Sequence, residues 1–305
     1  MPICGITKNA LSCTNDRGHD GAHSWVGLIH DARHRYFFNG KGPLTSVTTA
    51  LKVYDRSEAL VGWAQRETAK SALLHHELIT DHLTHHQLIP TCPVCVASGQ
   101  YWDGPADAAV QWLKRMPGYQ RDAAADIGTR VHRLADQVAR GELTEQIPEY
   151  ALAHVEVYQE WRARFKPKYR FIEFGILSVD HDYGGTGDIV ARIEKPIKAA
   201  GMWLIDIKSG GQLEKGTGVY PEQAMQLAAY GKAGAVGFPG EPKLFRMPPI
   251  DRYGILQIKP EGYRFVEMKV TDLTFEAFLH VLDLHRWRTG EAKTILGEEF
   301  IRGSA

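Results

Sequence analysis

Long apolar runs, net charge and C-terminal cysteines are all missing from this sequence of 305 residues. No segment approaches the roughly 18 apolar residues of a membrane-spanning helix, and the first residues lack the charged and apolar regions of a secretory signal. A cytoplasmic protein with no membrane partner is therefore expected. The formal net charge of +0 provides no global attraction to nucleic acid, but it is compatible with a local basic groove.

Cysteine is scarce, and its placement limits where a thiolate-bound metal can lie. All four cysteines are in the first third of the chain, at Cys4, Cys13, Cys92 and Cys95. In a reducing compartment, such residues more often bind a metal or remain free thiols than form disulfides. With His19 and His23, the first two cysteines make a tetrahedral set for a structural Zn²⁺. The alternative is a tail that carries four unrelated residues.

The tetrapeptide Cys92-Pro93-Val94-Cys95 is a separate feature. Its C-x2-C spacing is typical of half a metal site, with no second half evident nearby. Two free thiols in a loop explain the tetrapeptide equally well, so the role of Cys92 and Cys95 stays open.

The period of the apolar residues changes along the chain and predicts an α/β protein with a largely helical N-terminal half. Residues 1–34 are expected to form the small zinc module, 35–122 a helical part and 123–305 the core. Helical spacing covers residues 46–87, 106–116, 123–140 and 147–165. The expected core positions of the first helical stretch are Leu51, Leu60, Trp63, Ala64, Leu73, Leu74, Leu78 and Ile79.

The pattern becomes β-like after Pro167. Three strands are expected at 169–179, 187–193 and 202–208, followed by a helix at 221–233. A strand pair at 254–258 and 263–270 and a helix at 275–288 complete the chain. This order of strands and helices predicts a core formed by a β-sheet with helices packed on it.

Two acids and a lysine lie on neighbouring predicted strands. Asp188 follows the glycine-rich Gly184-Gly185-Thr186-Gly187, which we interpret as a turn before a strand. Asp206 and Lys208 are two residues apart on the next strand, so their side chains leave the same face. Adjacent strands can bring both carboxylates to one cation, and oxygen ligands suit Mg²⁺ or Mn²⁺. The backbone carbonyl of Ile207 is a further candidate ligand, and Lys208 is expected to face the scissile phosphate.

The next predicted helix carries Gln223, Gln226 and Tyr230 on one stripe. This stripe is expected to contact a phosphate backbone or to position Lys208. Taken singly, an Asp-x-Lys tripeptide is a common surface ion pair and G-x-G-D a common turn. The order and spacing of the whole set favour nuclease chemistry.

A family resemblance adds to this interpretation. The segment Gly128-Thr129-Arg130-Val131-His132, then G-T-G-D, D-I-K and Q-x-x-x-Y, resembles the RecB-type nuclease branch of the PD-(D/E)XK superfamily. The segments 35–40, 46–51 and 60–64 resemble the N-terminal part of phage-encoded members of this branch. The likeness covers roughly residues 35–300. It implies a restriction-endonuclease-like core, with a central mixed sheet flanked by helices. It also implies that His132, Asp188 and Asp206 bind the metal, that Lys208 is catalytic, and that Gln226 and Tyr230 support the site. Glu173 is a looser match as an additional acid.

The resemblance implies a Mg²⁺- or Mn²⁺-dependent deoxyribonuclease in the cytoplasm of a bacterial host. We expect an exonuclease of phage replication, recombination or repair that acts on single- or double-stranded DNA. Its partners would be a phage recombinase, a single-strand-binding protein or a helicase. The alternatives are a structure-specific or prespacer-type endonuclease, a catalytically idle DNA-binding or assembly protein, and a zinc-dependent interaction module with an attached α/β domain.

Two absences set limits on this resemblance. Iron–sulfur members of the branch place cysteines on both sides of the core, whereas no cysteine follows Cys95, so no such cluster is expected. No G-x-x-x-x-G-K-[ST] phosphate loop occurs, so the chain encodes no helicase motor.

Basic residues cluster before the first core strand. The candidates for a DNA path are Arg130, beside His132, and Arg162, Arg164, Lys166 and Lys168. A charge run of this kind is usually a solvated face. Next to an active site it can follow a phosphate backbone, and affinity then falls with salt.

Overall fold

The computed structural model describes residues 7–8, 11–12, 29–30, 35–38, 41–54, 57–80, 105–142, 146–238 and 243–297. It contains two compact units. The core unit is formed by Met1–Tyr54 with Arg130–Ala305, and the helical unit by Asp55–Thr129. The predicted zinc ligands Cys4, Cys13, His19 and His23 lie outside the described residues, as do Cys92 and Cys95. None of the described helices combines the length and the apolar character needed to cross a bilayer.

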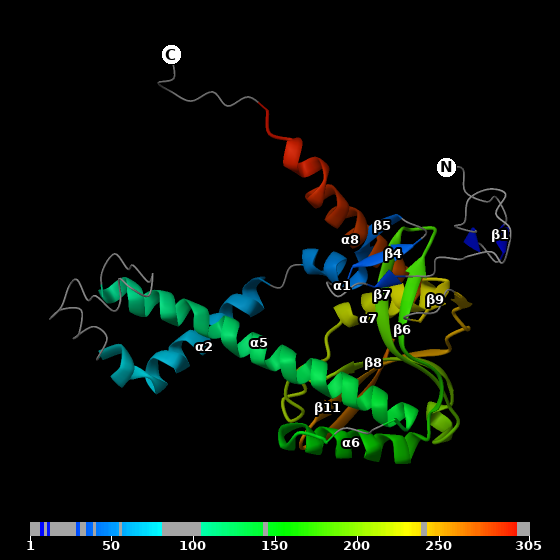
Figure 1. The fold of residues 1–305 in the computed structure, drawn as a ribbon, viewed down its shortest axis with the longest axis horizontal. Coiled ribbons are helices and arrows are strands. Elements are labelled where there is room, and N and C mark those ends of the chain that lie inside the picture. Colours follow the sequence, from blue (N-terminus) through cyan, green and yellow to red (C-terminus); the bar gives the residue numbers. More distant parts are fainter. Residues whose placement is uncertain are drawn as a thin grey trace. The chain divides into compact units, whose positions relative to one another are not determined.

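The core unit is built on a mixed sheet (Figure 1). A 10-stranded sheet is formed by β3 (Ile29–His30), β4 (Tyr36–Phe38), β5 (Lys41–Ser46), β6 (Lys168–Ser178), β7 (Tyr183–Ile193), β8 (Gly201–Lys208), β9 (Ala235–Gly237), β10 (Phe245–Arg246), β11 (Arg252–Lys259) and β12 (Gly262–Met268). Its centre is antiparallel from β6 through β7 to β8, while β8 and β11 run parallel. A separate antiparallel pair joins β1 (Thr7–Lys8) and β2 (Leu11–Ser12).

Helices cover both faces of this sheet. The C-terminal end of α5 (Pro105–Arg140) and α6 (Glu149–Phe165) bury Leu134, Tyr158 and Trp161 against one face. The helices α1 (Val47–Ala50), α7 (Glu222–Lys232) and α8 (Asp272–Thr289) pack on the other. Short 3₁₀ turns lie at Leu51–Val53, Ile197–Ala199 and Glu291–Thr294. The predicted mixed sheet flanked by helices is confirmed.

The prediction of two separate helices at 106–116 and 123–140 is wrong. The structure has one continuous helix, α5, which contains Pro117. Proline removes one backbone hydrogen bond and bends a helix, but it does not have to end it.

The prediction of a helical core at residues 46–87 is also wrong at four of its eight expected core positions. The helix α2 (Ser57–Leu74) leaves Leu60, Leu73 and Leu74 exposed, and the helical residues 76–80 that follow it leave Leu78 exposed, by 55% to 78% in all. Among the described residues of this stretch, the buried apolar ones are Val47 and Ala50, which α1 presents to the sheet core. Apolar periodicity marks the face of a helix that can be buried, but burial needs a second layer to cover it.

The glycines at 184–187 do not form the predicted turn but lie inside β7. A Cβ atom on Gly184 would lie 2.9 Å from the Cβ of Tyr36, and one on Gly185 would lie 2.9 Å from the ring of Tyr230. On Gly187 it would lie 2.6 Å from the Phe174 ring. The glycines therefore allow β4, α7 and β6 to approach β7 closely, next to Asp188.

Gly187→Ala is expected to destabilise the core unit by about 1–3 kcal/mol, because the new methyl group overpacks a site filled by the Phe174 ring. Thermal unfolding followed by circular dichroism measures the change. Gly210→Ala is the matched control, since its Cβ atom meets nothing within 4 Å. Equal melting temperatures for the two variants would contradict the packing explanation.

Candidate active site

The candidate site lies where β7 and β8 part. The two strands pair from Ile193 opposite Gly201 to Ile189 opposite Ile205. Beyond this point β7 continues beside β6, and β8 continues beside β11 as far as Lys208. Asp188 and Asp206 are the first residues past the last pair, so the fork brings two carboxylates from different strands together.

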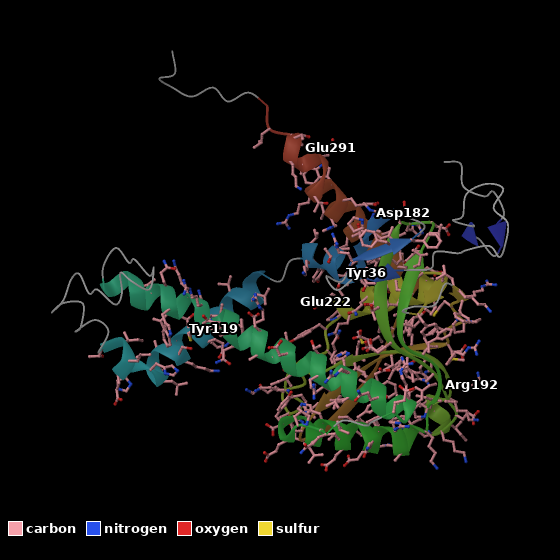
Figure 2. The ribbon with its side chains drawn as sticks, viewed as in Figure 1. Tyr36, Tyr119, Asp182, Arg192, Glu222 and Glu291 are labelled. Carbon is pink, nitrogen blue, oxygen red and sulfur yellow. The ribbon has the colours of Figure 1, made fainter. Side chains whose placement is uncertain are left out.

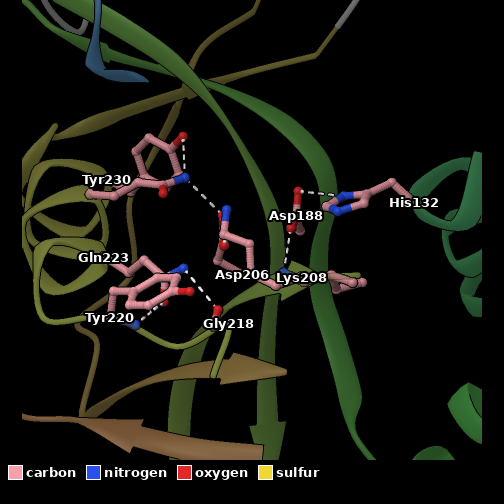
Figure 3. A network of polar contacts seen from close by, with 10 residues as sticks. His132, Asp188, Asp206, Lys208, Gly218, Tyr220, Gln223 and Tyr230 are labelled. Atoms are coloured by element: carbon pink, nitrogen blue, oxygen red, sulfur yellow. Dashed lines mark hydrogen bonds and ion pairs between the residues drawn. The ribbon is translucent and has the colours of Figure 1, made fainter. Parts of the chain in front are cut away.

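The Asp188 carboxylate spans the fork. Its Oδ2 atom accepts a hydrogen bond from the backbone N–H of Ile207 at 2.5 Å (Figure 3). Its Oδ1 atom lies 3.4 Å from Nδ1 of His132, which α5 supplies from the other side of the strands. The Asp188 side chain thus accepts the Ile207 N–H in place of a backbone carbonyl of β7. Its contact with His132 connects α5 to the sheet.

Glu173 on β6 completes a group that can hold a metal ion. One ligand atom each from His132, Glu173 and Asp188 lies within 4.8 Å of the others. Glu173 has a φ of 45°, in the left-handed region that a non-glycine residue adopts only at a cost of about 1–3 kcal/mol. Such strain is concentrated at functional sites, where the surrounding structure maintains it.

Asp206 is buried, with 3% of its surface exposed, and its two oxygens lie beside a lysine ammonium and an amide donor. Lys208 Nζ lies 2.7 Å from Oδ2, and Gln226 Nε2 donates to Oδ1 at 2.8 Å. Gln226 Nε2 also donates to the hydroxyl of Tyr230 at 3.0 Å. The Q-x-x-x-Y helix therefore reaches the acids through Gln226, and Tyr230 holds that amide in place.

The electrostatics of the site favour a cation. Burial lowers the pKa of His132, but the attraction of Asp188, Asp206 and Glu173 outweighs it and raises the pKa to about 9. Burial, together with repulsion by Asp188, raises the pKa of Glu173 to about 8. Burial also raises the pKa of Asp206, even though Lys208 opposes this. The raised pKa values indicate that negative charge is concentrated at these residues. A divalent cation bound among them can neutralise that charge.

The donor set fits a hard or borderline divalent ion. Carboxylate oxygens suit Mg²⁺ and Mn²⁺, and one imidazole nitrogen is compatible with Mn²⁺. The structure groups Glu173 with His132 and Asp188, whereas Asp206 is directed towards Lys208 and Gln226. A role for Asp206 as a ligand stays a prediction. In the sequence, only the looser family match indicated Glu173. The alternation of side chains along a strand does not predict where Glu173 lies, because its left-handed backbone interrupts that alternation.

The predicted stripe of Gln223, Gln226 and Tyr230 is wrong for Gln223. Its Nε2 atom donates to the carbonyl of Gly218 at 3.3 Å, and its Oε1 atom accepts from the N–H of Tyr220 at 3.0 Å (Figure 3). Gln223 therefore fastens the loop between β8 and α7. Residues three apart on a helix share a face only approximately, and the loop captures the first of them.

The predicted basic path contains side chains with structural partners. Arg162 Nη1 donates to the carbonyl of Val138 at 2.7 Å, at the end of α5. Arg164 Nη1 donates to the hydroxyl of Tyr263 at 3.4 Å, and Lys168 pairs with Glu194 at 2.9 Å.

The positions of these residues also set them apart from the acids. Lys168 lies opposite Arg192 in the strand register, four residues or about 13 Å along β7 from Asp188. Arg192 is labelled in Figure 2. Lys166 is the C-cap of α6, with a φ of 44°. Arg130 lies two residues before His132 on α5, so the two side chains do not share a face of the helix. A DNA contact by any of these residues stays a prediction.

The chain has matches among solved structures. No protein-family model matches the chain, and no curated protein does. It matches 13 chains of solved structures. One is SSO0001, at 13% identity and a TM-score of 0.28; the match covers 44% of this chain and 56% of SSO0001. Another is the alkaline exonuclease LHK-Exo from Laribacter hongkongensis, at 12% identity and a TM-score of 0.28, with 54% of this chain and 93% of that chain covered. Likenesses this weak define neither fold nor function.

Proposed function

We propose that this chain is a Mg²⁺- or Mn²⁺-dependent deoxyribonuclease, and that it acts as an exonuclease in phage replication, recombination or repair. The observation that carries the proposal is the fork between β7 and β8, where Asp188, Asp206 and Lys208 meet His132 and Glu173. The exonuclease and phage assignments rest on the motif resemblance. A structural zinc at Cys4, Cys13, His19 and His23 belongs to the same proposal, on ligand spacing alone.

Each residue has a role that its contacts support. A divalent cation held by His132, Glu173, Asp188 and Asp206, with the Ile207 carbonyl, would supply Lewis-acid stabilisation of the phosphate. Lys208 is 30% exposed at its side chain, so its ammonium group can leave Asp206 to donate to a phosphate oxygen. Gln226 and Tyr230 orient the Asp206 carboxylate through their hydrogen bonds.

The free-energy cost of burying two acids side by side argues against a catalytically idle protein. Asp188 and Asp206 are both buried, with 8% and 3% of their surfaces exposed. Burying two like charges side by side opposes folding unless cations compensate them. A chain without catalytic use for these acids would gain stability by losing one of them.

A linear DNA duplex tests the proposal. One strand is labelled, one end is blocked, and the protein is added with Mg²⁺, Mn²⁺ or EDTA. We expect shortening from the free end with either metal and none with EDTA. A covalently closed circle of the same sequence should survive, because an exonuclease needs an end. Cleavage of the circle would reassign the chain as an endonuclease, and an intact linear duplex with both metals would overturn the proposal.

His132→Ala is expected to weaken Mn²⁺ binding more than Mg²⁺ binding. The imidazole is the one nitrogen donor of the group, and Mg²⁺ depends on oxygen ligands. Calorimetric titration measures both affinities, and cleavage rates at saturating metal provide a second readout. His280→Ala, which removes an exposed histidine of α8, is the control. Equal losses for the two metals would contradict a ligand role for His132.

A further inference from the structure

A row of register-paired residues extends sideways from Lys208. Lys208 on β8 lies opposite Gln257 on β11, and Gln257 lies opposite Arg264 on β12. Directly opposed residues project from the same face of a sheet. Arg264 therefore shares a face with Asp206 and Lys208, two strand spacings or about 10 Å from Lys208.

Gln257 holds the loop after Lys208 in place over this row of residues by two hydrogen bonds. It is fully buried, and its Nε2 atom donates to the carbonyls of Gly210 at 2.6 Å and Thr217 at 2.8 Å. A Cβ atom on Gly218 would lie only 2.3 Å from that nitrogen, so the loop packs directly on the amide. The loop that leads away from Lys208 is thus held in a defined position.

Arg264 lies at the outer end of the row, and none of the described acidic residues pairs with it. A Cβ atom on Gly216, in the fastened loop, would lie 3.1 Å from its Nη1 atom, so the guanidinium group lies beside the loop backbone. Within the part of the chain that the structure describes, no hydrogen bond or ion pair engages Arg264. Arg252 on the same hairpin shows the contrast, because it pairs with Glu267 through two nitrogens at 2.9 and 2.6 Å.

We propose that Arg264 binds a backbone phosphate of the nucleic acid within about three nucleotides of the one that is cleaved. A guanidinium group without an acid suits a phosphate, which it can bind through two parallel hydrogen bonds. A separation of about 10 Å from Lys208 corresponds to no more than about three nucleotides along one strand. Lys259 adds positive charge to this end of the sheet, and its Nζ atom donates to the carbonyl of Ser209 at 3.0 Å. This inference rests on the proposed nuclease function and adds the first contact outside the reacting centre.

Binding of a fluorescent DNA oligonucleotide in Ca²⁺, without cleavage, tests the proposal over a series of salt concentrations. Arg264→Gln is expected to bind about tenfold more weakly, and the slope of log affinity against log salt should fall by about one. Arg264→Lys should keep the slope, because it keeps the charge. Arg192→Gln, the same change on an exposed arginine opposite Met202 at the other end of β8, should match the wild type. The single-turnover rate at saturating DNA should not change in Arg264→Gln.

The outcomes separate this inference from the proposed function. A wild-type protein that neither binds nor cleaves DNA would overturn both. Wild-type binding with an unchanged slope and affinity in Arg264→Gln would overturn the phosphate contact alone. A lowered melting temperature in both Arg264 variants, with the salt slope unchanged, would assign Arg264 a packing role and overturn the contact as well.

Discussion

Asp206→Ala is expected to lower the rate of DNA cleavage by about 10³-fold or more, while the chain stays folded. The carboxylate lies at the fork beside Asp188 and receives hydrogen bonds or charge from Gln226 and Lys208. Its removal takes away the acid that lies 2.7 Å from Lys208 and an oxygen donor for the cation. Folding tolerates the change, because Gln226 keeps its bond to Tyr230 and Lys208 is partly exposed.

The measurements for Asp206 are single-turnover cleavage, calorimetric metal affinity and melting temperature. Asp206→Asn is the sharper variant, because it keeps the shape and the acceptor for Gln226 but removes the charge. Both variants should be inactive, and both should bind Mg²⁺ and Mn²⁺ more weakly. Asp180→Ala, in the exposed turn between β6 and β7, is the matched control and should keep full activity. A near wild-type rate for Asp206→Asn would show that the proposed site is wrong.

Lys208→Ala is expected to lower cleavage by about 10²- to 10³-fold without weakening metal binding. The ammonium group carries a positive charge that can reach a phosphate and stabilise the charge that develops on it. It also competes with a metal for Asp206, from which it lies 2.7 Å away, so its loss should leave metal affinity unchanged or higher. Cleavage and metal titration therefore separate Lys208 from Asp206.

Two further variants make the Lys208 result specific. Lys208→Arg keeps the positive charge but changes its geometry, and it should recover only part of the rate. Lys232→Ala removes an exposed lysine that pairs with Asp272 at 2.9 Å, and it should cleave like the wild type. Loss of metal binding in Lys208→Ala would mean that the lysine maintains the ligand geometry, in conflict with the role proposed here.

Local sequence patterns predicted the strands that carry the acids. Strands expected at 169–179 and 202–208 correspond to β6 and β8, and the helix expected at 221–233 corresponds to α7. The two-residue spacing of Asp206 and Lys208 was enough to predict a shared face, and the structure pairs them. These features follow from the repeat of a strand or a helix, which a short stretch of sequence contains completely.

Features that depend on a neighbouring element were not predictable in this way. The exposure of Leu60 and Leu73 depends on whether another layer covers α2, which its periodicity does not specify. Gln223 has the right spacing to face the acids, but the loop before α7 takes up its amide group. The glycines before Asp188 have the composition of a turn, and only the rings of Tyr230 and Phe174 explain why they lie in a strand.

The sequence by itself determined the chemical inventory of this protein: two acids and a lysine on adjacent strands, a histidine on an earlier helix, and a glutamine and a tyrosine on a later one. Only the tertiary structure decided which of these residues meet. The fork brings Asp188 to the N–H of Ile207, and the left-handed backbone of Glu173 places a third acid with His132. The register across β8, β11 and β12 places Arg264 in line with Lys208. The physical reason is that strand pairing and helix packing join residues far apart in the chain, and no local period encodes those contacts.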